Sequence, residues 1–178
     1  MATSPIPFNK PVFLGTELEA IRTALETNCH AAGDGPLGKQ CEAALSAIQG
    51  QKTLLVTSCT HALEMAALLL GVEPGDEFIV PSFTFVSTAN AFTLRGARPV
   101  FADCDADGNM VPEEVARLRT AKTKAVLAVH YAGNSCDMDA LTSAAGSVPV
   151  VEDAAQALGA TYKGRPLGSL GALGAFSF

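Results

Sequence analysis

Short apolar segments alternate with amphipathic segments along most of this chain, beginning near residue 53. The apolar segments are rich in Val, Leu, Ile, Ala and Phe, and we expect buried strands at residues 53–57, 78–80, 99–102, 125–130, 148–151 and 172–178. The segments between them predict helices at residues 60–70, 84–94, 113–118 and 137–145, the last of them capped by Asp137. A hairpin is expected at residues 161–166, with its turn at Lys163-Gly164. Strands that alternate with helices predict an α/β fold, in which a mostly parallel sheet has helices on both faces.

The first part of the chain lacks strand signals and predicts two helices. Thr16 and Glu19 form a capping box for one helix, and a second is expected from about residue 39 to 48. No repeat, linker or low-complexity stretch divides the rest of the chain. We therefore predict an N-terminal helical arm over residues 1–49 and an α/β domain over residues 50–178.

Composition excludes several classes of protein. Of the 178 residues, 48% are hydrophobic and 17% are charged, which is typical of a globular protein rather than a disordered one. The net charge is −6 and no Lys/Arg-rich run occurs, so we expect no nucleic-acid partner. The five cysteines are widely spaced without a C-x-x-C pair, and no histidine pattern suggests a metal site. With no signal peptide and no apolar stretch that could span a bilayer, we expect a cytoplasmic protein that does not contact a membrane.

The apolar run VPVV, at residues 148–151, leads directly into Glu152 and Asp153. This order places carboxylates at the carboxyl end of a buried parallel strand, where open α/β sheets bind their ligands. A carboxylate in apolar surroundings needs a cationic partner, and the protonated ring nitrogen of pyridoxal phosphate is one such partner. The alternative from this segment alone is that Asp153 caps the turn or helix that follows.

Three other segments could contribute to the same site. Ser58 and Thr60 flank the start of a helix, where free backbone N–H groups and hydroxyls favour an anion such as phosphate, or serve as ordinary caps. His61 follows them, and the pattern favours a surface or packing role for its ring over a catalytic one, whereas its backbone N–H could face a phosphate. Phe85 follows the second strand and could stack on a planar ring or belong to the core. Ser177 lies between two phenylalanines and needs a hydrogen-bond partner if it is buried.

Taken together and in order, five segments are more specific than any of them alone: SCTHALEMAALLL, PGDEFIVPSFTFVSTANAFTLRGARPVF, AVHYAG, VVEDAAQALGATYKGRPLG and GAFSF. This set resembles the DegT/DnrJ/EryC1/StrS family of sugar aminotransferases, and the resemblance runs from IPFNKP to the last residue. It implies the three-layer α/β/α large domain of fold type I pyridoxal-phosphate-dependent transferases, truncated before the final strand of its sheet.

The resemblance also implies roles for individual residues in binding pyridoxal 5′-phosphate. Thr60, the backbone of His61, and Ser177 would hold the phosphate, Phe85 would stack on the ring, Asp153 would pair with the ring nitrogen, and Gln156 would lie near the 3′-oxygen. The implied reaction moves an amino group from L-glutamate to the C4 ketone of a dTDP-4-keto-6-deoxy sugar. The product would enter surface polysaccharide synthesis, such as enterobacterial common antigen or lipopolysaccharide, and the enzyme would be a homodimer.

The family's catalytic lysine lies in the motif S-F-H-x-x-K, whose first two residues match Ser177 and Phe178. The lysine would therefore fall four residues past Phe178, and none of the six lysines present matches the motif. We expect this chain to be the N-terminal part of a longer enzyme and to be inactive alone. Two alternatives remain: a sugar-nucleotide dehydratase of the same family, which has His in place of the lysine, or an inactive truncated binding remnant.

In the implied sheet, the final strand would lie beside the strand expected at residues 53–57. Without that neighbour, buried backbone groups would go unpaired at roughly 1–3 kcal/mol each, against a net stability of about 5–15 kcal/mol for a domain. We therefore predict that the isolated chain is unstable or prone to aggregate. Urea unfolding of the purified chain tests this, and a single cooperative transition of ordinary stability would contradict it.

Overall fold

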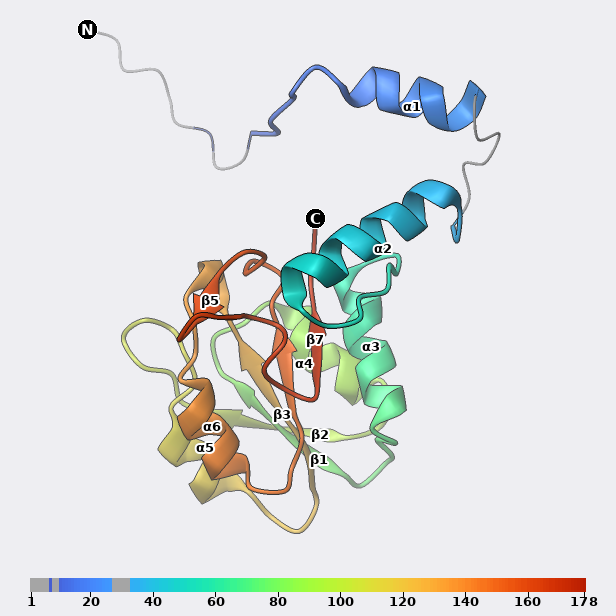
Figure 1. The fold of residues 1–178 in the computed structure, drawn as a ribbon. Helices are drawn as coiled ribbons and strands as arrows, with labels where there is room; N and C mark the ends of the chain where they lie inside the picture. Colours follow the sequence, from blue (N-terminus) through green and yellow to red (C-terminus); the bar gives the residue numbers. More distant parts are fainter. Residues whose placement is uncertain (1–6, 8–9, 27–32) are drawn as a thin grey trace, which may run out of the picture.

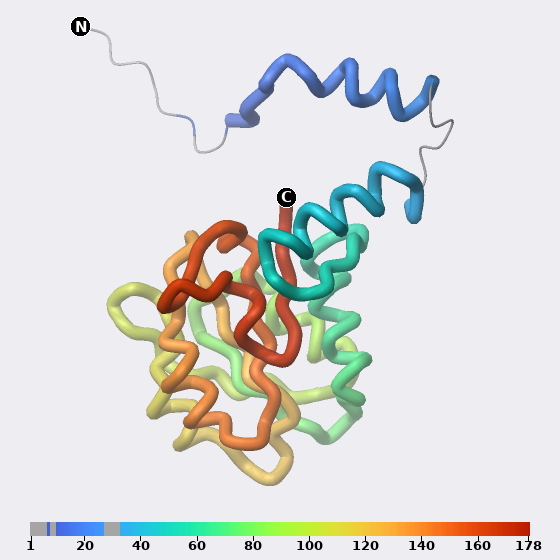
Figure 2. Tube along the Cα trace, in the orientation of Figure 1, coloured from blue at the N-terminus to red at the C-terminus, as the bar shows by residue number. Residues whose placement is uncertain are grey.

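The computed structural model describes residue 7, residues 10–26 and residues 33–178 (Figure 1). Its helices are α1 (Glu17–Glu26), α2 (Pro36–Gln49), α3 (Cys59–Leu69), α4 (Val86–Thr93), α5 (Pro112–Leu118) and α6 (Met138–Ala145), with one 3₁₀ turn, η1 (Tyr131–Gly133). Its strands are β1 (Glu77–Pro81), β2 (Arg98–Ala102), β3 (Thr123–Val129), β4 (Val150–Asp153), β5 (Thr161–Tyr162), β6 (Arg165–Pro166) and β7 (Leu173–Ala175). The two helices expected near the N-terminus are α1 and α2 (Figure 2). Helix α1 buries none of its residues.

Five strands form one sheet in the order β2-β1-β3-β4-β7, and every neighbouring pair is parallel. The register pairs Asp153 at the end of β4 with Val129 of β3 and with Ala175 of β7. The carboxyl ends of these three strands therefore lie level at one edge of the sheet. The predicted α/β fold with a mostly parallel sheet is confirmed.

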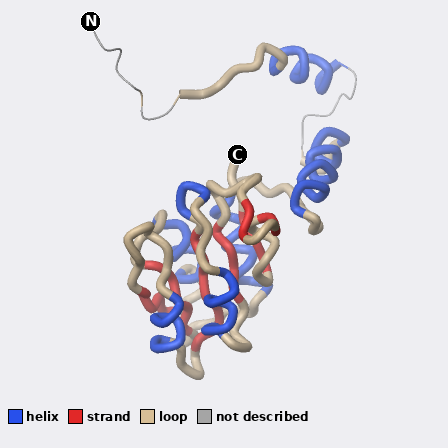
Figure 3. The backbone as a smooth tube through the Cα atoms, turned by 60° about the vertical axis from the view of Figure 1, so that its left-hand side comes forward, coloured by secondary structure: helices blue, strands red, loops and turns tan. Residues whose placement is uncertain are grey.

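Helices cover both faces of this sheet and bury the strands between them (Figure 3). On one face, α3 and α4 pack over a cluster that includes Phe78, Leu127 and Val151. On the other face, α5 and α6 pack over a cluster that includes Val126 and Val150. Consecutive strand residues belong to opposite clusters because side chains alternate across a strand. Since both faces of the sheet are buried, β3 and β4 each contain consecutive apolar residues rather than an alternation of apolar and polar ones.

The strand predicted at residues 53–57 is absent, and this prediction was wrong. The segment pairs with none of the described strands, and Leu54 is 60% exposed. Side chains of α2 take its backbone donors instead: the Thr53 N–H donates to Ser46 Oγ at 2.9 Å and the Leu55 N–H donates to a Glu42 carboxylate oxygen at 2.9 Å. Apolar, β-branched composition favours a strand, but a strand forms only where a neighbour completes its hydrogen bonds.

The bounds of the five strands in the sheet differ from the predicted ones by one to three residues, most of all in β4 and β7, and two local predictions are confirmed. β4 begins and ends two residues later than predicted, so both carboxylates belong to the strand, and β7 is shorter than residues 172–178. The hairpin turns at Lys163 and Gly164, whose φ angles of 49° and 78° are typical of a type I′ turn. Asp137 caps α6 by accepting a hydrogen bond from the Ala140 N–H at 3.0 Å.

Candidate active site

Two adjacent carboxylates in β4 lie on opposite faces of the sheet, and both are buried. Asp153 shares its face with Val151, under α3 and α4, whereas Glu152 shares its face with Val150. A buried carboxylate is unfavourable unless hydrogen bonds replace its water. The donors around each side chain therefore show what each carboxylate does.

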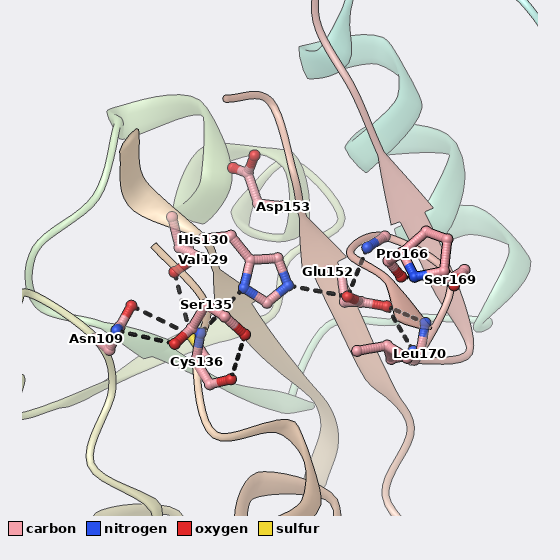
Figure 4. A network of polar contacts seen from close by, with 12 residues as sticks. Asn109, Val129, His130, Ser135, Cys136, Glu152, Asp153, Pro166, Ser169 and Leu170 are labelled. Carbon is pink, nitrogen blue, oxygen red and sulfur yellow. Dashed lines mark hydrogen bonds and ion pairs between the residues drawn. The ribbon is translucent and has the colours of Figure 1, made fainter. Parts of the chain in front are cut away.

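Glu152 is completely buried and accepts four hydrogen bonds, one for each of its roughly four acceptor positions (Figure 4). The His130 Nε2 donates to one carboxylate oxygen at 2.9 Å, and the Gly168 N–H donates to the same oxygen at 2.7 Å. The N–H groups of Leu170 and Gly171 each donate to the other oxygen at 2.6 Å. Glu152 thus joins the end of β3, its own strand and the loop that leads into β7.

The hydrogen bonds around His130 determine its tautomer. The backbone N–H of Cys136 donates to His130 Nδ1 at 3.3 Å, so this nitrogen carries a lone pair and the ring proton lies on Nε2, facing Glu152. Burial alone would raise the pKa of Glu152, but the hydrogen bonds from His130 and from the amides of Gly171 and Gly168 outweigh burial and lower the pKa from 4.5. Glu152 is therefore a carboxylate at neutral pH.

Glycines allow the loop at residues 168–174 to lie close enough to β4 for these contacts. A Cβ at Gly171 would lie 2.5 Å from the carbonyl oxygen of Val150, and a Cβ at Gly174 would lie 2.1 Å from that of Gly168. Any side chain at these two positions would push the loop away from Glu152. Glycine spacing and the buried glutamate therefore act together to place β7 and the residues that follow it.

Asp153 faces the amino ends of α3 and α4 and also accepts three hydrogen bonds. The Thr88 hydroxyl donates to Oδ2 at 2.7 Å, and the Cys59 thiol (3.9 Å) and the Ala155 N–H (3.2 Å) donate to Oδ1. Burial, together with the Asp153 charge and hydrogen bond, raises the pKa of the Cys59 thiol to about 12, so it stays protonated and remains a donor. The Ala155 contact shows that Asp153 does stabilise the turn after β4, without excluding a ligand-binding role.

The amino end of α3, which we call the anion cradle because its free N–H groups could hold an anion, lies beside Asp153. Ser58 is the N-cap, and its hydroxyl accepts from the His61 N–H at 3.1 Å. Within the described residues, the N–H groups of Cys59 and Thr60 have no acceptor, as expected for the first two positions of a helix. The imidazole of His61 is exposed and its Nδ1 contacts the Thr57 hydroxyl at 2.5 Å, so neither its ring nor its amide is directed at the cradle.

The remaining predicted residues surround the same space. Phe85, the N-cap residue of α4, is 68% exposed and does not belong to the core. The Gln156 side-chain oxygen accepts from the Ala132 N–H at 2.6 Å, which leaves its NH₂ group directed elsewhere. Ser177 follows β7 and is exposed.

A cavity of about 390 Å³ collects five of the six predicted site residues. Thr60, Phe85, Asp153, Gln156 and Ser177 all line it, and His61 does not. A larger cavity of about 720 Å³ lies between residues 51–58 and β7, but Ser177 is the only predicted site residue in its lining. We therefore place the candidate active site in the smaller cavity, because the titratable and anion-binding groups converge there.

Sequence reasoning missed the residues that support this site. Thr88, Cys59 and His130 were not singled out, and Glu152 was noted only as a carboxylate beside Asp153. Their contacts join residues 22 to 94 positions apart, which no local pattern reports. The available signal was the pair of adjacent carboxylates in an apolar strand, since each needs its own set of donors.

In the described part of the chain, no group of His, Cys, Asp and Glu side chains could hold a metal ion, and Cys41, Cys59, Cys104 and Cys136 are free. None of the described helices has the length and apolar character needed to cross a bilayer.

Comparison with known proteins agrees with this fold, an α/β protein with a mostly parallel sheet. Residues 14–178 match the DegT/DnrJ/EryC1/StrS aminotransferase family, and the chain belongs to this family. The aminotransferase from Psychrobacter cryohalolentis superimposes with a TM-score of 0.90 and 40% identity, over 97% of this chain and 45% of that one.

Two other solved structures show the same relationship. The putative sugar aminotransferase Spr1654 from Streptococcus pneumoniae, in its PLP form, matches with a TM-score of 0.88 and 35% identity, over 97% of this chain and 48% of that one. Helicobacter pylori PseC matches with a TM-score of 0.90 and 27% identity, over 97% and 47% of the two chains. The chain therefore spans less than half the length of each of these proteins.

The Glu152 network predicts an acid-sensitive contribution to stability. Because the folded-state pKa of Glu152 is below 4.5, its contribution is fully present above that pH and is lost as the pH falls through the folded-state value. Glu152→Gln places an NH₂ group against backbone N–H donors, and we expect it to lower the free energy of unfolding at pH 7 by roughly 3 kcal/mol. Urea unfolding of both proteins at pH 7 and pH 4 measures this, and the difference should shrink at pH 4.

Asp34→Asn is the surface control, since it breaks an ion pair with Lys39 in which both side chains are largely exposed. We expect little change in unfolding from this variant at either pH. Equal stability of Glu152→Gln and the parent chain at pH 7 would show that the buried network does not hold the site together.

Proposed function

We propose that this chain forms the cofactor-binding half of a pyridoxal-phosphate-dependent sugar aminotransferase. One observation carries the proposal: a buried carboxylate and the free amino end of a helix face the same 390 Å³ cavity. A carboxylate suits a protonated ring nitrogen, and a helix amino end suits a phosphate. The family and the PLP and PMP forms of the Streptococcus pneumoniae protein support this assignment.

The donor and acceptor groups around the cavity fit each part of this cofactor. The N–H groups of Cys59 and Thr60, with the hydroxyls of Thr60 and Ser177, would bind the phosphate. The exposed ring of Phe85 would cover one face of the pyridine. The NH₂ group of Gln156 is oriented as a donor, because its oxygen already accepts from Ala132, and would serve the 3′-oxygen.

Bound pyridoxal phosphate would supply an electron sink and a carrier for the amino group. Asp153 would hold the proton on the ring nitrogen, which is the condition for that sink to operate. Among the described residues, no lysine lines the cavity. The chain therefore provides cofactor binding and ring protonation, and the proton-transferring lysine that the family resemblance implies is not among these groups.

We extend the proposal to the substrate. The resemblance of IPFNKP and VSTANAF-LRGA to one subgroup favours a dTDP-4-oxo-6-deoxy-D-glucose transaminase, with L-glutamate as amino donor and a dTDP-4-keto-6-deoxy sugar as acceptor. The product would serve surface polysaccharide synthesis, such as enterobacterial common antigen or lipopolysaccharide, in the cytoplasm. We further propose a homodimer. The broader sugar-related class is supported by the Streptococcus pneumoniae protein, a putative sugar aminotransferase, and by Helicobacter pylori PseC, an aminotransferase involved in pseudoaminic acid biosynthesis.

The cofactor assignment predicts that Asp153→Asn weakens pyridoxal phosphate binding about 10- to 100-fold, because a charge-assisted hydrogen bond is lost from a buried site. Equilibrium dialysis of the purified protein against pyridoxal phosphate measures the affinity, with circular dichroism to confirm folding. Asp139→Asn removes a surface carboxylate paired with Lys163 and should bind like the parent protein. If the parent protein does not bind pyridoxal phosphate, the proposed function is wrong.

The substrate assignment predicts selective recognition of the thymidine nucleotide. We expect dTDP-linked 4-keto-6-deoxyglucose to raise the melting temperature of the cofactor-loaded protein more than the corresponding UDP-linked sugar does. Differential scanning fluorimetry at matched ligand concentrations measures both shifts. A larger shift with the UDP sugar would reject the dTDP assignment while leaving the cofactor assignment intact.

A further inference from the structure

Asp153 lacks a basic partner in the described part of the chain, although it is only 7% exposed. Its carboxylate is held by neutral donors: the Thr88 hydroxyl on Oδ2, and the Cys59 thiol and Ala155 N–H on Oδ1. A carboxylate offers roughly four acceptor positions, so the two donors on Oδ1 and the one on Oδ2 leave a single position, which lies on Oδ2. A ligand in the cavity would therefore share Oδ2 of Asp153 with the Thr88 hydroxyl.

The direction of the hydroxyl hydrogen bonds follows from the charge of Asp153. An ionised carboxylate can only accept, so the single hydroxyl proton of Thr88 points at Asp153. The Thr84 hydroxyl lies 2.8 Å from that of Thr88, which can then only accept from it. The two threonines form a chain in which Thr84 donates to Thr88 and Thr88 donates to Asp153. Hydrogen bonds in such a chain polarise and strengthen one another.

The location of Thr88 makes it a support rather than a ligand. Thr88 is completely buried in the first turn of α4 and does not line the cavity, whereas Thr84 and Asp153 do. Phe85, the residue proposed to cover the cofactor ring, lies between the two threonines in the chain, and the Thr88 N–H donates to its carbonyl oxygen at 3.1 Å. One short segment thus fixes both the ring-stacking residue and the carboxylate.

We propose that Thr88, backed by Thr84, is a positioning residue that orients Oδ2 of Asp153 toward the ring nitrogen of the cofactor. This inference rests on the proposed function and adds a residue to it. Its specific consequence is that removing the Thr88 hydroxyl weakens recognition of the ring nitrogen, while contacts to the phosphate and to the ring face are retained.

Thr88→Val replaces the hydroxyl by a methyl group of similar size, and Thr88→Ser keeps the hydroxyl and removes the methyl group. Two probes are used with the purified protein: pyridoxal phosphate, and its analogue with carbon in place of the ring nitrogen. We expect Thr88→Val to bind pyridoxal phosphate roughly tenfold more weakly, to bind the carbon analogue like the parent protein, and to shift the ¹⁵N resonance of ring-labelled cofactor toward the unprotonated position. Thr88→Ser should retain the parent affinity and resonance.

The outcomes separate this inference from the proposed function. If Asp153→Asn leaves the preference for pyridoxal phosphate over the carbon analogue unchanged, the proposed function itself fails, whatever Thr88→Val does. If Asp153→Asn removes that preference but Thr88→Val does not, the positioning role is wrong and the proposed function stands. Equal weakening of both probes by Thr88→Val, with no change in the ¹⁵N resonance, would show a purely structural role and overturn the inference.

Discussion

A single buried carboxylate, that of Glu152, joins parts of the chain that are distant in sequence. Its four hydrogen bonds come from the end of β3 and from the glycine-containing loop before β7, and every acceptor position is used. A buried charge with all positions filled tolerates few alternative arrangements, because any displacement leaves an acceptor unpaired. This constraint keeps the carboxyl ends of three neighbouring strands level, and the candidate active site lies at that level edge.

The opposite face of β4 carries the chemistry that this constraint supports. The Asp153 carboxylate must be fixed in position while keeping one hydrogen-bond acceptor position free for a ligand. Its three donors are neutral groups from α3, α4 and the following turn. Neutral donors stabilise the carboxylate without cancelling its charge, so the charge remains available to a cation in the cavity. The proposed site suits a cofactor with a cationic ring nitrogen and an anionic phosphate, and the aminotransferase family of this chain supports that assignment.

Local patterns predicted most of the fold, since strand and helix periodicity, the Asp137 cap and the turn at Lys163-Gly164 are properties of neighbouring residues. The strand expected at residues 53–57 failed because strand formation depends on a hydrogen-bonding neighbour, which composition does not report. The convergence of Thr60, Phe85, Asp153, Gln156 and Ser177 on one cavity was predictable only through the family resemblance. Thr88 was not predictable, since its contact with Asp153 spans 65 positions and threonine in a helix usually has no partner so distant. The division at residues 49 and 50 stays a prediction.

Glu152 and Asp153 are neighbours in one strand, so their side chains face opposite sides of the sheet. A change of register would therefore exchange the surroundings of both side chains at once. Insertion or deletion of one residue in the preceding apolar run would rotate the whole strand by half a turn. The longer side chain would then enter the cavity, and the shorter one would face glycine amides that it cannot reach in the same geometry. The length of β4 is therefore constrained by both carboxylates at once.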